Sequence, residues 1–186
     1  MSLPPTSPDE MLPSGDAADA DDLLPLIEDD PDNDTLTPAP SGTPWTVLVV
    51  DDDADVHHAT EIALRGLLIE GRPLTLLHAY SRAEALARIE QTEDLAVMLL
   101  DVVMESDDAG LTLVREVRTR LRREALRIIL RTGQPGYAPE LVTIRDYDIN
   151  DYRTKSELTR VRLFTSLTTA VRAYRQMRAH EQTRRG

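Results

Sequence analysis

The sequence predicts an α/β fold in which a doubly wound sheet of five parallel strands carries helices on both faces and ends in an extended C-terminal helix. Between residues 45 and 173, short apolar runs alternate five times with longer segments, most of them of helical periodicity. Two of the runs, at 45–50 and 95–100, are almost continuously apolar, as in parallel strands that are covered on both faces. Polar residues follow directly after most of these runs, at the sheet edge where α/β folds place their functional groups.

The first strand is expected at residues 45–50, and three carboxylates follow it: Asp51, Asp52 and Asp53. A helix is expected over about 54–70, before a Gly and a Pro end it. Its predicted apolar face consists of Val56, Ala59, Ile62, Ala63 and Leu67. The second strand is expected at 74–80. The sequence Ser-Arg-Ala-Glu that follows is a capping box, which predicts a helix from there to about residue 91.

The third strand, at residues 95–101, is the stretch around which the chain is organised. Six apolar residues end in one carboxylate, Asp101. Taken alone, Asp101 could equally start a turn or cap a helix. After a loop over 102–109, we expect a helix over about 111–123 and a fourth strand at 126–131, which leads to Thr132.

The last part of the chain is expected to hold a short helix from 139 to about 147, a weaker fifth strand at 149–153, and a long helix capped by Ser156. Apolar residues of the long helix keep a three-four spacing at Leu158, Val161, Phe164, Leu167, Val171 and Tyr174. We place a domain at 45–173 and a helical extension or linker at 174–186. The extension is interpreted either as a signalling or dimerisation helix that leads to an output region, or as a solvated helix end.

The negative charge of the chain is concentrated in its first segment. Residues 1–44 contain eleven of the 33 acidic residues and no Lys or Arg, although the whole chain has 21 basic residues and a net charge of −12. Such a segment cannot bury enough apolar surface to offset its ordering entropy, so we expect a disordered acidic tail. A second interpretation is that residues 23–30 dock on an Arg-rich surface and mask it.

Composition disfavours several classes of protein. The absence of cysteine excludes disulfides and thiolate metal sites. No apolar run approaches the length of a membrane span, and the N-terminus does not have the pattern of a secretory signal. No DNA-binding element accompanies the Arg-rich end of the chain. We therefore expect a cytoplasmic protein that binds neither membranes nor nucleic acid.

Residues that follow four of the predicted strands should meet at one edge of the sheet: Asp51, Asp52, Asp101, Thr132 and Lys155. Carboxylates that share a site repel one another unless a cation is present, and oxygen ligands of this kind suit Mg²⁺. A carboxylate can also act as the nucleophile toward a phosphoryl donor, with a Lys and a hydroxyl to hold the phosphoryl oxygens. Lys155 is distinctive because the other twenty basic residues are all Arg.

Four motifs, in this order and spacing, resemble the receiver domain of bacterial two-component response regulators, a flavodoxin-like fold. They are Val-Leu-Val-Val-Asp-Asp-Asp at 47–53, Leu-Leu-Asp-Val-Val-Met at 99–104, Ile-Leu-Arg-Thr-Gly at 129–133 and Asp-Tyr-Arg-Thr-Lys at 151–155. The resemblance covers residues 45–174. It implies a cytoplasmic phosphoprotein of signal transduction that accepts a phosphoryl group from a histidine kinase and that is not an enzyme beyond autodephosphorylation.

The resemblance also implies roles for individual residues. Asp101 would be the phosphoacceptor that becomes an aspartyl phosphate. Asp52, Asp101 and the backbone carbonyl of Val103 would bind Mg²⁺ directly, and Asp51 would act through water. Asp53 is expected to cap the following helix.

Three further residues would hold and report the phosphoryl group. The resemblance assigns Thr132 and Lys155 to the phosphoryl oxygens, and it makes Thr132 and Tyr152 the switch residues that shift on phosphorylation. Tyr152 could also be an ordinary strand tyrosine.

The sequence departs from the family pattern in three places, one of which is Met104-Glu105, where the family usually has Met-Pro after the phosphoacceptor. Ser156 stands where the family usually has a proline after the lysine, and the loop 105–110 is one residue longer and carries Asp107 and Asp108. These acids either alter metal affinity or belong to a solvated loop. The departures motivate an alternative function, a receiver-like interaction or dimerisation module that is independent of phosphorylation. A phosphohydrolase with an Asp nucleophile is less favoured, because Val103 stands where a second acid would help.

A narrower resemblance concerns the phrases at 101–110, 130–136 and 147–152. They look like receivers placed ahead of larger output regions, some of which are HD-GYP cyclic-di-GMP phosphodiesterases. No HD-GYP motif occurs in residues 1–186. The resemblance implies a C-terminal output domain beyond these residues. A homodimer through the last helices is the expectation if the long helix is a dimerisation helix.

Overall fold

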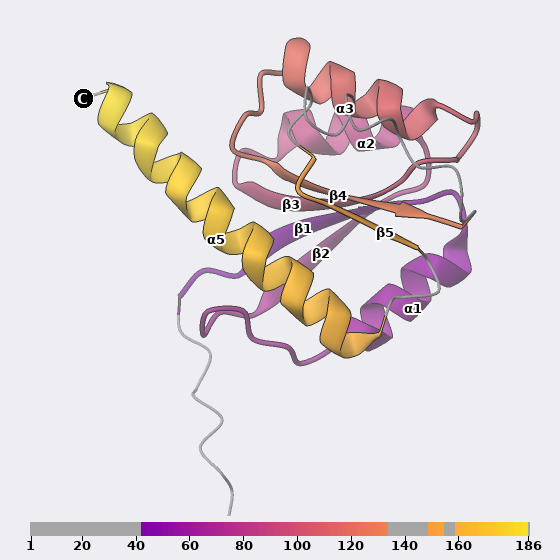
Figure 1. Ribbon diagram of the computed structural model, residues 1–186, viewed down its shortest axis with the longest axis horizontal. Helices are drawn as coiled ribbons and strands as arrows, with labels where there is room; N and C mark the ends of the chain where they lie inside the picture. Colours follow the sequence, from indigo (N-terminus) through magenta and orange to yellow (C-terminus); the bar gives the residue numbers. More distant parts are fainter. Residues whose placement is uncertain (1–41, 134–148, 155–158, 186) are drawn as a thin grey trace, which may run out of the picture. The chain divides into compact units, whose positions relative to one another are not determined.

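The computed structural model describes residues 42–133, 149–154 and 159–185. Five parallel strands form one sheet in the order β2-β1-β3-β4-β5 (Figure 1). The strands are β1 (Trp45–Val50), β2 (Leu74–Ala79), β3 (Leu95–Asp101), β4 (Arg127–Thr132) and β5 (Asp151–Thr154). The predicted α/β architecture with a parallel sheet is confirmed. All of β3 is buried because helices cover both faces of the sheet.

Four helices surround the sheet within the described residues (Figure 1): α1 (Ala54–Leu64), α2 (Arg82–Gln91), α3 (Ala109–Thr119) and α5 (Arg160–Arg185). α2 and α3 pack on one face, and α1 and α5 pack on the other. The short helix expected at 139–147 and the cap expected at Ser156 lie outside the described residues. Among the residues that are described, no helix is long and apolar enough to cross a membrane.

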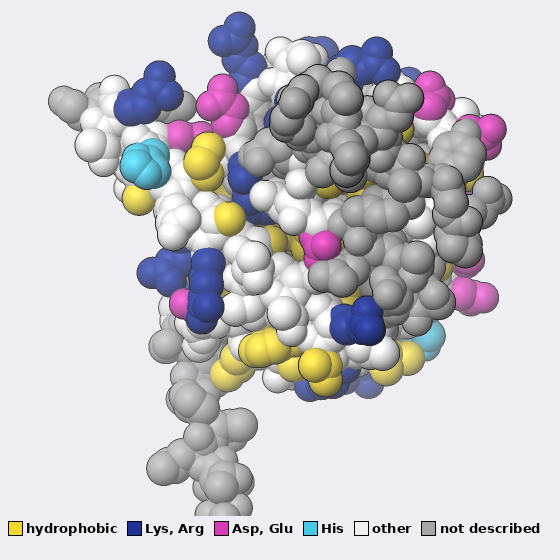
Figure 2. All heavy atoms as spheres, viewed as in Figure 1, with side chains coloured by type: hydrophobic (Ala, Val, Ile, Leu, Met, Phe, Trp, Pro, Cys, Tyr) yellow, Lys and Arg dark blue, Asp and Glu magenta, His cyan; other side chains and the backbone are white. Residues whose placement is uncertain are grey.

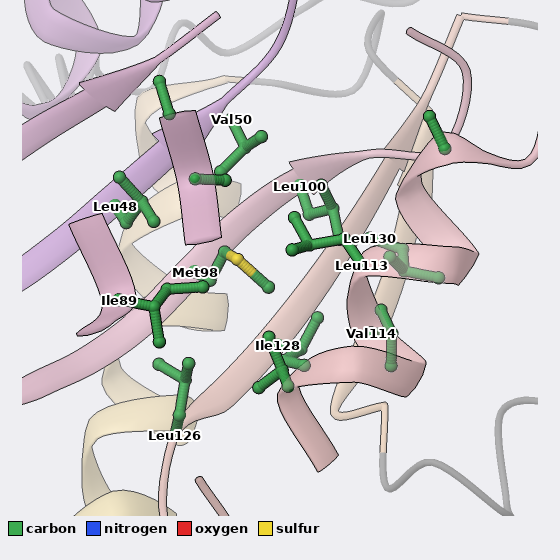
Figure 3. Packing of buried hydrophobic residues seen from close by; sticks show 14 of the residues in the cluster. Leu48, Val50, Ile89, Met98, Leu100, Leu113, Val114, Leu126, Ile128 and Leu130 are labelled. Carbon is green, nitrogen blue, oxygen red and sulfur yellow. The ribbon is translucent and has the colours of Figure 1, made fainter. Parts of the chain in front are cut away.

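The core on the α2–α3 face interlocks aliphatic side chains from strands and helices (Figure 3). Met98 and Leu100 of β3 belong to the same cluster as Ile89 of α2 and Leu113 of α3, and each is fully buried. Burying a side chain of this size contributes roughly 1.5–3 kcal/mol. The continuous apolar runs of the sequence therefore supply the main stabilisation of the sheet.

The core on the opposite face is closed by Trp45 at the start of β1. Its indole nitrogen donates to the carbonyl of Ile69 at 2.9 Å, and its ring meets Tyr174 of α5 edge-on at 6.3 Å between centroids. The guanidinium of Arg72 lies 3.5 Å above the same ring. These contacts join the first strand to the C-terminal helix.

The expected course of α1 was wrong in length and in face. The helix ends at Leu64 instead of near residue 70, because Gly66 turns the chain with a φ of +69°. Its buried residues are His57, Thr60 and Leu64, whereas Ile62 of the predicted apolar face is 51% exposed. Two polar residues thus occupy the inward face, where His57 bonds the carbonyl of Asp51, just after β1, and Thr60 bonds Arg131 of β4.

α5 is one continuous helix of 26 residues. Leu167, Val171 and Tyr174 are buried as their spacing predicted, but Val161 and Phe164 are exposed. Charged residues of α5 pair with the domain, and Arg172 lies 2.7 Å from Glu70. On the face shown in Figure 2, basic side chains are dispersed among acidic ones rather than gathered in one patch.

Candidate functional site: an acidic cluster at the end of the central strands

The acidic cluster, defined as Asp51, Asp52 and Asp101, lies at the carboxyl ends of the two central strands. β1 and β3 are paired so that Val50 lies beside Leu100, which brings the residues that follow them together. Asp51 and Asp101 are 0% and 2% exposed, and Asp52 is exposed. One carboxylate oxygen from each residue lies within 4.8 Å of the others.

Local hydrogen bonds fix Asp51 at this edge. One of its carboxylate oxygens accepts from the Asp53 amide at 3.0 Å, and its own amide donates to Ala79 of β2 at 3.2 Å. The Asp51 carbonyl lies 2.8 Å from Nε2 of His57. Because a carbonyl can only accept, this nitrogen carries a proton. Asp53 caps α1 as expected, with its side chain accepting from the Asp55 amide.

A chain of hydrogen-bonding groups leads from Asp51 to the surface. Nδ1 of His57 lies 2.7 Å from Nδ1 of His78, and Nε2 of His78 lies 3.0 Å from a carboxylate oxygen of Glu61. Burial and the neighbouring His57 lower the pKa of His78, and Glu61 opposes this shift. The backbone of Asp51 is therefore connected to an exposed carboxylate through two imidazole rings.

A buried arginine lies behind the acidic cluster. Arg131 of β4 is 0% exposed, its Nη2 lies 3.6 Å from an oxygen of Asp51, and its Nη1 donates to the hydroxyl of Thr60 at 3.1 Å. Burial lowers the pKa of Arg131, while the charges of Asp51 and Asp101 raise it. The guanidinium thus interacts electrostatically with both buried carboxylates.

The structure describes three of the four other residues to which the sequence assigned a role: Thr132, Val103 and Tyr152. Thr132 ends β4 and is buried, one position beyond the pairing of β4 with β3, and Val103 is half-buried after β3. Tyr152 lies in β5, beside Leu130 of β4. Lys155 lies outside the described residues. The roles expected for these residues remain predictions.

The donor set of the acidic cluster fits a hard divalent cation. Three carboxylates supply oxygen ligands, and exposure of Asp52 leaves one side open to water, as Mg²⁺ prefers. Within the described residues the cluster does not include Asp107 or Asp108, which are exposed in the loop before α3. The acidic cluster could therefore bind a metal ion.

Sequence reasoning missed three features of this site. Arg131 and His57 are the polar neighbours of Asp51, and Gly110 of α3 packs on the backbone of Asp101. The signal for Arg131 in the sequence was its charge: it follows the apolar residues 128–130 in a strand that was expected to be buried. His57 gave no signal, because its role depends on contacts between elements distant in sequence.

Comparison with known proteins gives one curated relative and many solved structures. No protein-family model matches the chain. The curated protein is 3'3'-cGAMP-specific phosphodiesterase 2 of Vibrio cholerae serotype O1, with 46% identity over 137 residues. The match covers 74% of this chain but only 26% of the relative, so the chain spans about a quarter of that protein.

Several of the similar solved structures are described as receiver domains. One is a response regulator receiver protein from Pseudomonas putida, with a TM-score of 0.57 and 25% identity over 69% of this chain and 99% of that one. Another is the signal receiver domain of an HD domain-containing protein from Pseudomonas fluorescens, with a TM-score of 0.64 and 21% identity over 75% of this chain and 95% of that one.

Fold, sheet order and acidic cluster are those of a response-regulator receiver domain, which confirms the resemblance seen in the four sequence motifs. The narrower resemblance is confirmed as well. One structural neighbour comes from an HD domain-containing protein, and the curated relative is a cyclic-dinucleotide phosphodiesterase by name.

Proposed function

We propose that the chain is a phospho-accepting receiver of two-component signal transduction, in which Asp101 takes a phosphoryl group from a histidine kinase with the help of Mg²⁺. The observation that carries this proposal is the meeting of Asp101 with Asp51 and Asp52 at the end of the central strands. It is an arrangement in which one carboxylate can react while the others hold a cation.

The proposed reaction uses Asp101 as the nucleophile. A carboxylate oxygen attacks the phosphorus of a phosphohistidine, a P–O bond forms as the P–N bond breaks, and the imidazole leaves with the electron pair. Asp52, Asp101 and the carbonyl of Val103 would hold Mg²⁺ directly, and Asp51 would hold it through water. The ion would offset charge on the phosphoryl oxygens when it is bound. A later attack by water releases phosphate and restores the carboxylate.

The proposed signal is a rearrangement at the β4–β5 side of the sheet. The new phosphoryl group adds charge and acceptor oxygens at the edge where Thr132 ends β4. Its hydroxyl is proposed to donate to one oxygen, with Lys155 at another, while Tyr152 changes position. A two-state shift of this kind would alter the surface around β5 and α5 that a partner reads.

The proposed partners follow from the same comparison. The curated relative is about four times as long as the matched part, and its name describes a cyclic-dinucleotide phosphodiesterase. We propose that the receiver regulates an output region of this kind, with residues 174–186 as the connection. Dimerisation through the last helix is proposed as the means of transmission.

A second candidate function is an interaction module that works without phosphorylation. The observation that favours it is Arg131, whose charge partly compensates the buried carboxylates without any metal. Under this proposal the chain folds and binds its partner in one fixed state.

Intact-mass measurement separates the two candidates. After incubation with acetyl phosphate and Mg²⁺, we expect the full chain to gain the mass of one phosphoryl group. Asp101→Ala should gain none, and Asp107→Ala, a matched change in the exposed neighbouring loop, should react like the parent. An unmodified parent after rapid quenching over a range of Mg²⁺ concentrations would favour the interaction module.

A further inference from the structure

The buried guanidinium of Arg131 is held between a hydroxyl of α1 and a carboxylate of the acidic cluster. Nη1 donates to the hydroxyl of Thr60 at 3.1 Å, and that hydroxyl donates in turn to the carbonyl of Val56 at 2.7 Å. Nη2 faces Asp51 at 3.6 Å, and both side chains are fully buried. The side chain is therefore anchored by α1 on one side and directed at the acidic cluster on the other.

We propose that Arg131 is a built-in counter-cation of the acidic cluster, which weakens divalent-cation binding there and keeps the site stable when no cation is bound. This inference rests on the proposed function, because it assumes that Asp51, Asp52 and Asp101 hold a divalent cation. It adds a residue that tunes the occupancy of that site. Arg131 acts through Asp51 and is a positioning residue.

The sign of the effect follows from the charges. Three carboxylates carry three negative charges, and Arg131 offsets one of them because arginine stays protonated in proteins. A divalent cation that approaches the same carboxylates is repelled by the guanidinium. Unlike a bound ion, the guanidinium is tethered to β4 and cannot be displaced into solvent.

The change in cation affinity on removing Arg131 can be estimated from the pKa shifts that a nearby charge causes in carboxylates. A unit charge within about 4–6 Å shifts the pKa of a carboxylate by about 1–3 units, which corresponds to roughly 10- to 1,000-fold in the binding of a proton. Salt screens buried pairs poorly, and a divalent cation carries twice the charge of a proton. Removing the guanidinium should therefore tighten divalent-cation binding at least about tenfold.

The test measures cation binding directly on the full chain. Mn²⁺ affinity is read from the electron paramagnetic resonance of the free ion, and Mg²⁺ affinity from competition with Mn²⁺. Arg131→Met should bind both ions at least about tenfold more tightly than the parent. Arg131→Lys keeps the charge and should stay close to the parent. Should Arg131→Met fail to fold, the neutral and polar Arg131→Gln is expected to show the same gain.

Arg127 provides a matched control at the other end of the same strand. It is also buried, but its guanidinium donates to the carbonyl of Ala125, away from the acidic cluster. Arg127→Met should lose stability while keeping the cation affinity of the parent. If Arg131 has only a structural role, both Arg131→Met and Arg127→Met should lose stability and keep the cation affinity of the parent.

Thermal unfolding gives a second readout. Without divalent cation, Arg131→Met should melt below the parent, because the buried positive charge that faces Asp51 is removed. Addition of Mg²⁺ should raise its melting temperature more than it raises that of the parent or of Arg127→Met.

The outcomes distinguish this inference from the proposed function. Equal or weaker cation binding by Arg131→Met overturns the counter-cation role and leaves the proposed metal site standing. If neither parent nor variant binds Mn²⁺ or Mg²⁺ at millimolar concentration, the proposed metal site fails and this inference fails with it.

Discussion

Gly110, in the first turn of α3, lies directly against the backbone of Asp101. A Cβ atom at position 110 would stand 2.2 Å from the carbonyl oxygen of Asp101 and 2.8 Å from the Cα of Val102. The Gly110 amide donates to the Val102 carbonyl at 3.1 Å. The helix therefore approaches the proposed phosphoacceptor more closely than any residue with a side chain would allow.

Gly110→Ala should displace the backbone that carries Asp101. The clash is with backbone atoms, which cannot rotate away, so we expect a loss of about 1–3 kcal/mol in the free energy of unfolding. Phosphorylation by acetyl phosphate should slow as well, because the carboxylate moves relative to Asp51. Urea denaturation and the mass assay check the two effects. Gly66→Ala is the comparison, since its added Cβ meets nothing within 4 Å but its φ of +69° is strained.

Gly110→Ala and Gly66→Ala should both lose stability, but only Gly110→Ala should be phosphorylated more slowly. Gly66→Ala is expected to lose stability through backbone strain and to keep the phosphorylation rate of the parent. A Gly110→Ala protein that reacts as fast as the parent would show that the close approach of α3 does not position Asp101.

β1 and β3 were predictable because each is a short apolar run, and such a run forms a buried strand whichever elements pack against it. β3 was expected at 95–101 and is found there. The inward face of α1 was not predictable from periodicity. His57 and Thr60 are polar, and they are buried only because Asp51 and Arg131 arrive from other elements to bond them.

The acidic cluster could be predicted for a different reason. Parallel strands end at one edge, so Asp51 and Asp101 had to meet once the two runs were taken as neighbours. Arg131 was overlooked, because a charged residue in a strand is expected at the surface. Its burial is explained by the carboxylate of Asp51 that faces it and by the Thr60 hydroxyl that accepts its hydrogen bond.

The stability of the chain should depend on pH through His78. Its pKa is lowered in the folded chain, so the unfolded chain binds more protons between that pKa and the ordinary value of 6.5. The free energy of unfolding therefore falls as pH decreases through this window, and it levels off below the folded pKa. His78→Gln should flatten this slope in urea titrations at several pH values.

His58 provides the control for this prediction. It lies on α1 beside His57 but is exposed to solvent. His58→Gln should keep the slope of the parent across the same pH range. A slope that survives in His78→Gln would assign the pH dependence to another group.

The proposed boundary between domain and extension can be tested by truncation. Tyr174 is 6% exposed and packs on Trp45, and Met177 packs on the same core. Deleting residues 174–186 should cost about 3 kcal/mol or more, as the loss of a large buried aromatic side chain does. Deleting only 179–186 should cost less than about 1 kcal/mol, because the residues removed are mostly exposed.

Denaturant unfolding of the two truncated chains decides the matter. Equal stability of both would show that the packed domain ends before Tyr174 and that the aromatic contact contributes little. A large loss on removal of 179–186 would instead assign a folding role to the last turns of α5.

Asp52 should separate metal binding from folding. It is the exposed member of the acidic cluster, so Asp52→Asn removes one ligand charge without leaving a buried group unpaired. In the absence of metal we expect its stability to equal or slightly exceed that of the parent, because repulsion among the carboxylates falls. The stabilisation that Mg²⁺ gives the parent should disappear, as thermal unfolding with and without the ion would show.

Asp53→Asn is the matched change one residue further along. Asp53 accepts from the Asp55 amide as the cap of α1, and Asn caps helices about as well as Asp. This variant should therefore keep both the stability of the parent and its response to Mg²⁺. Loss of the Mg²⁺ response in Asp53→Asn, with the response intact in Asp52→Asn, would move the cation from the predicted ligands to the start of α1.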